Sequence, residues 1–128
     1  MSMGIIESGE YNKVAGLGGD ATSSSDVITL TSNFTGYVLA TKRSGVTSLV
    51  FNNVKPVSKT GGDRIAVLPA KYRPIVNSFM ILWLGDNCRV VGVLTDGGID
   101  VGGSGITSWF DGDNALPAWG TIAYPSAD

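Results

Sequence analysis

From residue 26 onward, the sequence consists of short runs of β-branched and aromatic residues that are separated by glycine, asparagine or proline. Runs of this length, bounded by turn residues, are typical of β-strands, and no segment predicts a helix. We expect about nine strands, at Asp26–Leu30, Tyr37–Lys42, Val46–Phe51, Arg64–Leu68, Asn77–Leu84, Cys88–Thr95, Ile99–Val101, Ile106–Phe110 and Trp119–Tyr124.

The segments between these strands have the composition of tight turns. Arg43-Ser44-Gly45, Gly85-Asp86-Asn87 and Asp96-Gly97-Gly98 each contain residues that tolerate a positive φ angle. Strands that are joined by such turns pair antiparallel with their neighbours in sequence. The sequence therefore predicts an all-β fold, an antiparallel β-sandwich or jelly-roll-like domain.

The N-terminal part of the chain differs from the rest in composition. Residues 8–25 are rich in glycine and serine and have no sustained apolar period, which favours an extended arm or linker over residues 1–25. The sandwich domain then occupies residues 26–128. Because Ile5 and Ile6 lack a preceding basic region and are followed by Glu7, we expect no signal peptide.

One expected strand is apolar on both faces. The run Phe79–Leu84 does not alternate between apolar and polar residues, although a strand with one wet face should do so. The inner face is covered by the opposite sheet, so the outer face needs another partner. A second copy of the chain is the simplest partner, and a loop of the same chain is the alternative. The run is too short to span a bilayer, so we expect no membrane insertion.

Composition argues against several classes of function. The chain has 9 Lys and Arg against 11 Asp and Glu, scattered without a basic stripe, so nucleic acid is not an expected partner. It has no histidine and a single cysteine, Cys88. This removes the usual Ser-His and Cys-His nucleophiles and the commonest transition-metal ligand. We expect no catalytic residues, no cofactor and no metal site.

The stretch around residues 108–114 has the chemistry of a saccharide site. Trp109 offers an aromatic face for the C–H bonds of a sugar, while Asp111, Asp113 and Asn114 offer carboxylate and amide groups for its hydroxyls. Two other interpretations remain. Trp109 beside a turn can instead anchor the loop to the core, and Asp111-Gly112-Asp113-Asn114 can be an exposed turn or part of a calcium loop, although it lacks the distal glutamate of an EF-hand.

A corner motif resembles a known group of viral proteins. The segment Leu68-Pro69-x-x-Tyr72-Arg73-Pro74 is similar to the strand-then-corner element of receptor-binding domains from bacteriophage tail fibres and baseplates. Gly36-Tyr37-Val38, Gly45-Val46-Thr47 and the closing strand Trp119–Tyr124 extend the similarity to about residues 36–125.

The resemblance implies both a fold and a role. It implies the C-terminal receptor-binding head of a tail-fibre or baseplate protein, which is a homotrimer in the virion tail, contacts other tail proteins and recognises a saccharide on the bacterial surface. A purely structural trimerisation or capping domain is the alternative. A polysaccharide-degrading enzyme is a third hypothesis, which the missing histidines and the absence of internal repeats disfavour.

Overall fold

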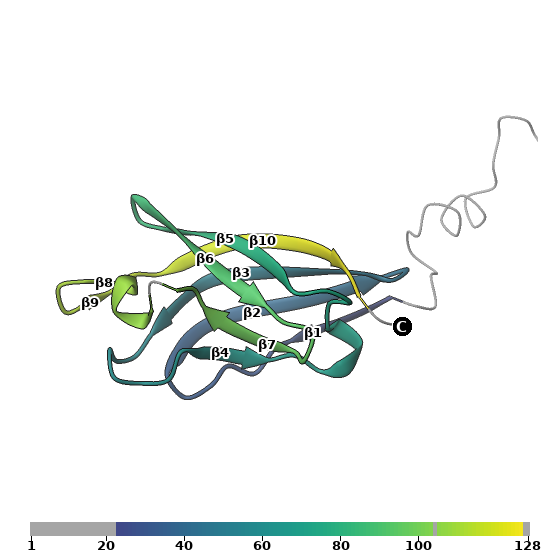
Figure 1. The fold of residues 1–128 in the computed structure, drawn as a ribbon, viewed down its shortest axis with the longest axis horizontal. Helices are drawn as coiled ribbons and strands as arrows, with labels where there is room; N and C mark the ends of the chain where they lie inside the picture. Colours follow the sequence, from purple (N-terminus) through teal and green to yellow (C-terminus); the bar gives the residue numbers. More distant parts are fainter. Residues whose placement is uncertain (1–22, 104, 127–128) are drawn as a thin grey trace, which may run out of the picture.

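The protein is described by a computed structural model, which covers residues 23–103 and 105–126. Eight strands form one antiparallel sheet in the order β1-β2-β3-β10-β5-β6-β7-β4 (Figure 1). They are β1 (Ser24–Val27), β2 (Phe34–Arg43), β3 (Val46–Pro56), β4 (Arg64–Val67), β5 (Ser78–Leu84), β6 (Asn87–Val93), β7 (Gly98–Val101) and β10 (Ala118–Pro125). The all-β, antiparallel prediction is confirmed.

The remaining elements are short. β8 (Phe110–Asp111) and β9 (Asn114–Ala115) form a second, two-stranded sheet, and two 3₁₀ helices, η1 (Ala70–Tyr72) and η2 (Ile106–Trp109), lie between strands. The strand expected at residues 106–110 was therefore wrong for most of its length. Of the expected arm, residues 1–22 lie outside the described residues, and Ser24 and Ser25 belong to β1.

The tight turns form as their residues predict. Ser44 and Gly45 both have positive φ, 48° and 80°, between Arg43 and Val46, which pair directly across β2 and β3. Such a two-residue turn matches the right-handed twist of the flanking strands. Gly85, with φ 59°, makes the equivalent turn between β5 and β6.

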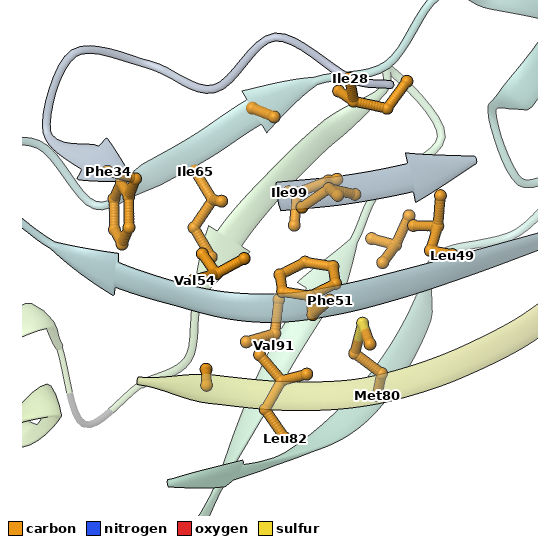
Figure 2. Close-up of a cluster of buried hydrophobic side chains, with 14 of the residues drawn as sticks. Ile28, Phe34, Leu49, Phe51, Val54, Ile65, Met80, Leu82, Val91 and Ile99 are labelled. Carbon is orange, nitrogen blue, oxygen red and sulfur yellow. The ribbon is translucent and has the colours of Figure 1, made fainter. Parts of the chain in front are cut away.

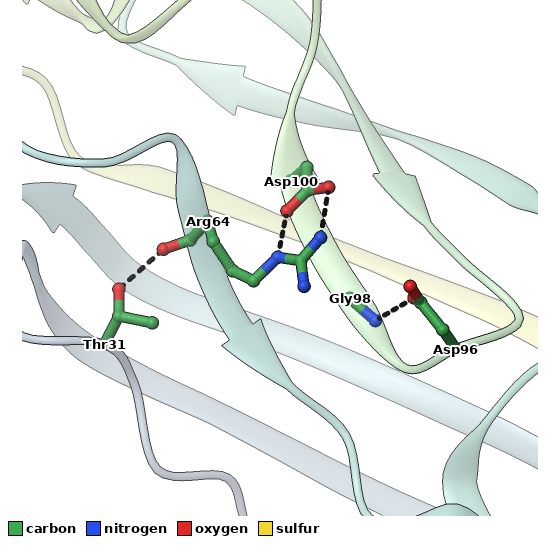
Figure 3. A network of polar contacts seen from close by, with 5 residues as sticks. All are labelled: Thr31, Arg64, Asp96, Gly98 and Asp100. Carbon is green, nitrogen blue, oxygen red and sulfur yellow. Dashed lines mark hydrogen bonds and ion pairs between the residues drawn. The ribbon is translucent and has the colours of Figure 1, made fainter.

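The large sheet curls until its first and last strands meet. Leu30, which follows β1, forms a bridge with Ala66 in β4. Thr31 strengthens this seam, because its backbone N–H donates to Ile65 O at 2.9 Å. Its hydroxyl donates to Arg64 O at 2.6 Å (Figure 3). The two sides of the predicted sandwich are thus parts of one sheet, and little of its edge is left unpaired.

The core fills the inside of this curl (Figure 2). Inward-facing side chains alternate with outward-facing ones along most of β2, β3 and β5, as the pleat requires. Residues that are at most 1% exposed include Val38, Leu49, Phe51, Val54, Ile65, Leu68, Leu82, Leu84, Val91 and Ile99. They come from β2, β3, β4, β5, β6, β7 and the corner after β4, so one core serves all described parts of the large sheet.

The corner motif connects distant strands. Tyr72 in η1 is fully buried, and its hydroxyl donates to the Asp26 carboxylate at 2.5 Å. Tyr124 in β10 in turn donates to the backbone oxygen of Tyr72 at 2.6 Å. The motif therefore fastens β1 and β10 to the corner that follows β4.

The curled sheet, which we call the barrel, has two distinct ends. Ser24 lies opposite Lys42, and Tyr124 lies opposite Thr47, so β1 begins and β10 finishes beside the β2–β3 turn. We call this the proximal end. The distal end, on the left in Figure 1, holds the β5–β6 turn, η2 and the β8–β9 hairpin. The chain thus enters and leaves the described domain at one end and exposes loops at the other.

Candidate ligand-binding site

The β8–β9 hairpin carries three of the four residues predicted for ligand binding. Asp111 pairs with Asn114 across the hairpin, and Gly112, with φ 62°, allows the turn between them. The side chains of Asp111, Asp113 and Asn114 are all exposed. The structure therefore brings these carboxylate and amide groups together at the distal end.

Lys59 braces the hairpin from the loop after β3. Its ammonium lies 3.3 Å from the Asp113 carboxylate and 5.5 Å from the centre of the Phe110 ring. Since Asp113 is fully exposed, this ion pair adds little stability. It shows that the hairpin and the loop after β3 lie beside one another.

Trp109 is the last residue of η2, directly before the hairpin. It is 1% exposed and packs edge-to-face on Phe34, with ring centres 6.0 Å apart and an interplanar angle of 80°. A side chain in this position has no free ring face for a sugar to stack on. The burial fits the alternative of an anchor between η2 and the core, and the ligand-binding role of Trp109 stays a prediction.

Arg89 is a distal-end residue that the sequence reasoning missed. Its Nη1 donates to Cys88 O at 2.8 Å and its Nη2 to Ser108 O at 3.0 Å. Nε is buried, and none of the described residues accepts its hydrogen bond. The available signal was a charged residue inside the expected strand Cys88–Thr95, next to Val90 and Val91.

Two surface hollows adjoin the Arg89 side chain. One, of about 370 Å³, is lined by Cys88, Arg89, Val90, Gly102, Gly103, Ser108 and the largely buried Trp109. The other, of about 340 Å³, is lined by residues that include Asp86, Asn87, Arg89, Ser108 and Asp111. Arg89 and Ser108 are common to both hollows, so the arginine lies between them.

A second surface of interest is the outer face of β5, β6 and β10. Met80, Leu82 and Leu84 point into the core, whereas Phe79, Ile81 and Trp83 point outward and are 64%, 66% and 56% exposed. Exposed apolar neighbours continue the surface, since Val90 lies opposite Ile81 and Trp119 opposite Trp83. We call this surface the apolar face, and it consists of Phe79, Ile81, Trp83, Val90 and Trp119.

The apolar face confirms that this strand is apolar on both sides. No segment among the described residues covers it, so within that part of the chain the alternative of a covering loop is not realised. Patches of several adjoining large apolar side chains commonly mark interaction sites.

The described residues contain no group of three or more His, Cys, Asp or Glu side chains that could hold a metal ion. No helix in the same residues is long and apolar enough to cross a membrane.

Comparison with known proteins identifies the fold. No family model matches the sequence, and no curated protein matches it. The structure is similar to the crystal structure of the receptor binding protein (gp15) of Listeria phage PSA, with a TM-score of 0.59 and 15% sequence identity. The match covers 94% of this chain and 71% of that one. At this identity the comparison shows a shared fold.

Proposed function

We propose that this chain is a receptor-binding domain of a phage tail or baseplate, which attaches the virion to a saccharide on the bacterial surface and has no catalytic activity. The observation that carries the proposal is the likeness of fold to a phage receptor binding protein over nearly the whole chain. The corner motif at residues 68–74, which resembles such domains, supports it independently.

The geometry of the two ends is suited to this role. Because the described chain enters and leaves at the proximal end, the distal loops point away from whatever the domain is attached to. Asp111, Asp113 and Asn114 are exposed there and can accept hydrogen bonds from sugar hydroxyls. Loops presented by a rigid β scaffold are a common location for binding residues.

The proposal includes assembly into a homotrimer through the apolar face. Five large side chains that contact water in one protomer favour burial against another copy. A trimer also multiplies attachment, because several weak sites on one particle engage one surface together. Other phage tail or baseplate proteins are the expected partners at the proximal end.

The direct test is attachment of the fluorescently labelled protein to a panel of bacterial strains. We expect binding to a subset of strains, and we expect periodate oxidation of the cells, which destroys sugar diols, to abolish it. Binding that survives periodate but not protease treatment would identify a protein receptor instead. Binding to no strain would favour a structural capping domain, and release of reducing sugar ends from cell-wall polysaccharide would indicate an enzyme.

Matched variants locate the binding end. Asp111→Ala and Asn114→Ala remove distal acceptors and should weaken attachment several-fold, as expected when hydrogen bonds to a ligand are lost. Arg43→Ala at the β2–β3 turn removes an exposed side chain at the proximal end and should leave attachment unchanged. If only Arg43→Ala lost attachment, the binding site would lie at the proximal end, contrary to the proposal.

A further inference from the structure

We infer that Arg89 binds an acidic group, a carboxylate or a phosphate, on the saccharide. This inference deepens the proposed function and rests on it for the saccharide itself. A charged side chain occupies an unusual place in the sheet.

Arg89 occupies a core-facing position. In β6 it lies opposite Leu82 of β5, which is fully buried, and two residues before Val91, which is also fully buried. Its side chain therefore follows the row of inward-pointing residues toward the distal end and reaches the backbone of η2 at Ser108. An apolar residue would be expected at such a position, since arginine is rarely placed inside without a partner.

The guanidinium is held in place but not neutralised. It donates two hydrogen bonds to backbone carbonyls, which leaves three of the five N–H groups of an arginine without an acceptor among the described residues. No carboxylate of those residues lies within ion-pair distance of it. Arg64 differs, because Asp100 accepts from its Nε at 2.7 Å and its Nη2 at 3.0 Å (Figure 3).

The larger hollow is suited to an anion. Arg89 is the only charged residue among those that line it, so an entering anion finds no carboxylate. Gly102, which lines it, packs closely on β6, because a Cβ there would lie 2.2 Å from Val90 O. A fixed guanidinium beside an open space fits the planar, two-point recognition of a carboxylate or phosphate.

The smaller hollow has complementary chemistry. Asp86, Asn87 and Asp111 line it on the other side of Arg89, and their oxygens accept hydrogen bonds from hydroxyl groups. A ligand that carries both an acidic group and neighbouring hydroxyls can use the two hollows together. An acidic sugar or a sugar phosphate has this combination.

The competing explanation is that Arg89 only ties η2 to β6 through the carbonyls of Cys88 and Ser108. Nuclear magnetic resonance of the full chain separates the two, because each arginine Nε–H gives its own signal. The probes are sodium glucuronate, glucose 6-phosphate, inorganic phosphate and glucose at constant ionic strength. We expect the Arg89 signal to shift and saturate with the three anions and not with glucose, while the Arg64 signal stays in place.

Variants test the same point in the cell assay. Arg89→Gln keeps hydrogen-bond donors but removes the charge, and it should weaken attachment by about tenfold or more, as the loss of a charge-assisted contact predicts. Arg64→Gln is the matched control and should attach like the parent. Thermal unfolding of both variants identifies a loss that comes from misfolding, and an Arg89→Lys variant that recovers part of the attachment would show that charge matters.

The results distinguish this inference from the proposed function. If the protein attaches to cells and Arg89→Gln attaches equally well, the anion site is wrong and the receptor-binding function stands. If the protein attaches to no cells but the Arg89 signal responds to the anions, the anion site stands and the function is wrong. An Arg89 signal that glucose moves as much as glucuronate overturns the inference.

Discussion

At the scale of single residues, Trp109 holds the distal end of the barrel to the core. It is fully buried by Phe34 and by the elements around η2, so its removal leaves a large void. Cavities of this kind are costly because the surrounding structure relaxes only in part.

We predict that Trp109→Ala lowers the free energy of unfolding by roughly 3–5 kcal/mol. Urea denaturation at a fixed protein concentration measures the change, and Asp113→Asn should change it by less than about 0.5 kcal/mol because that ion pair is exposed. A stable Trp109→Ala protein that has lost only saccharide binding would contradict the packing role and restore the ligand-binding one.

Asp26 gives the corner motif a dependence on pH. The hydrogen bond from Tyr72, and after it the contact with Lys71, lowers the pKa of the Asp26 carboxyl below its ordinary value of 3.8. A carboxyl whose pKa is lower in the folded state stabilises the fold above its unfolded pKa, and that contribution is lost as the pH falls through the folded pKa.

We therefore predict that the parent protein loses more of its unfolding free energy between pH 6 and about pH 2.5 than Asp26→Asn does. Thermal melts across this pH range supply the comparison, and Asp63→Asn, at an exposed position away from the corner, is the control. Parallel pH profiles for the parent and Asp26→Asn would mean that this carboxylate contributes nothing through its charge.

At the scale of elements, β5 is the strand whose outer side matters most. Its outward residues form the centre of the apolar face, between β10 on one side and β6 on the other. In the proposed trimer, a charge placed there would remain unpaired in a dry interface, which is strongly unfavourable.

We predict that Ile81→Glu dissociates the oligomer into folded monomers. Its side chain is 66% exposed in the protomer, so the change does not disturb the core. Val57→Glu, at a residue that is 60% exposed in the loop after β3, is the matched control and should keep the parent's oligomeric state. Sedimentation velocity distinguishes the species, and an Ile81→Glu protein that stays assembled would exclude the apolar face as the interface.

The elements also show which parts of the fold local sequence patterns can predict. Turn residues such as Ser44-Gly45 and Gly85 correctly predicted where the flanking strands end, because the conformation of a tight turn depends on only a few neighbouring residues. The run Ile106–Phe110 looked like a strand because isoleucine, threonine and aromatic residues favour one, yet it forms η2, where tertiary packing of Trp109 on Phe34 outweighs propensity.

The candidate site was predictable only in part for the same reason. Asp111, Asp113 and Asn114 are neighbours in sequence, so their grouping on one hairpin followed from the turn at Gly112. Arg89 meets Ser108 only because β6 and η2 come together in the fold. No local pattern reports such a contact between residues that are distant along the chain.

At the scale of the whole molecule, the proposed trimer sets a simple expectation. We predict that light scattering of the protein at micromolar concentration gives about three times the chain mass of 13.3 kDa. The physical reason is that a protomer alone exposes the whole apolar face to water. A mass equal to that of one chain would show that the apolar face has some other partner. A mass equal to that of two chains would indicate a two-fold dimer in place of the three-fold trimer.

The place of β10 in the sheet has a consequence for biosynthesis. It is the last described strand in sequence, yet it lies between β3 and β5 and joins β1-β2-β3 to β5-β6-β7-β4. On the ribosome, these two groups of strands emerge before residues 118–125. The Leu30–Ala66 bridge can already link them at one side, but the gap between β3 and β5 cannot close until residues 118–125 follow. During translation, β3 and β5 each keep an open edge toward other nascent chains, so polysomes making this protein face their greatest risk of mispairing just before the sheet is completed.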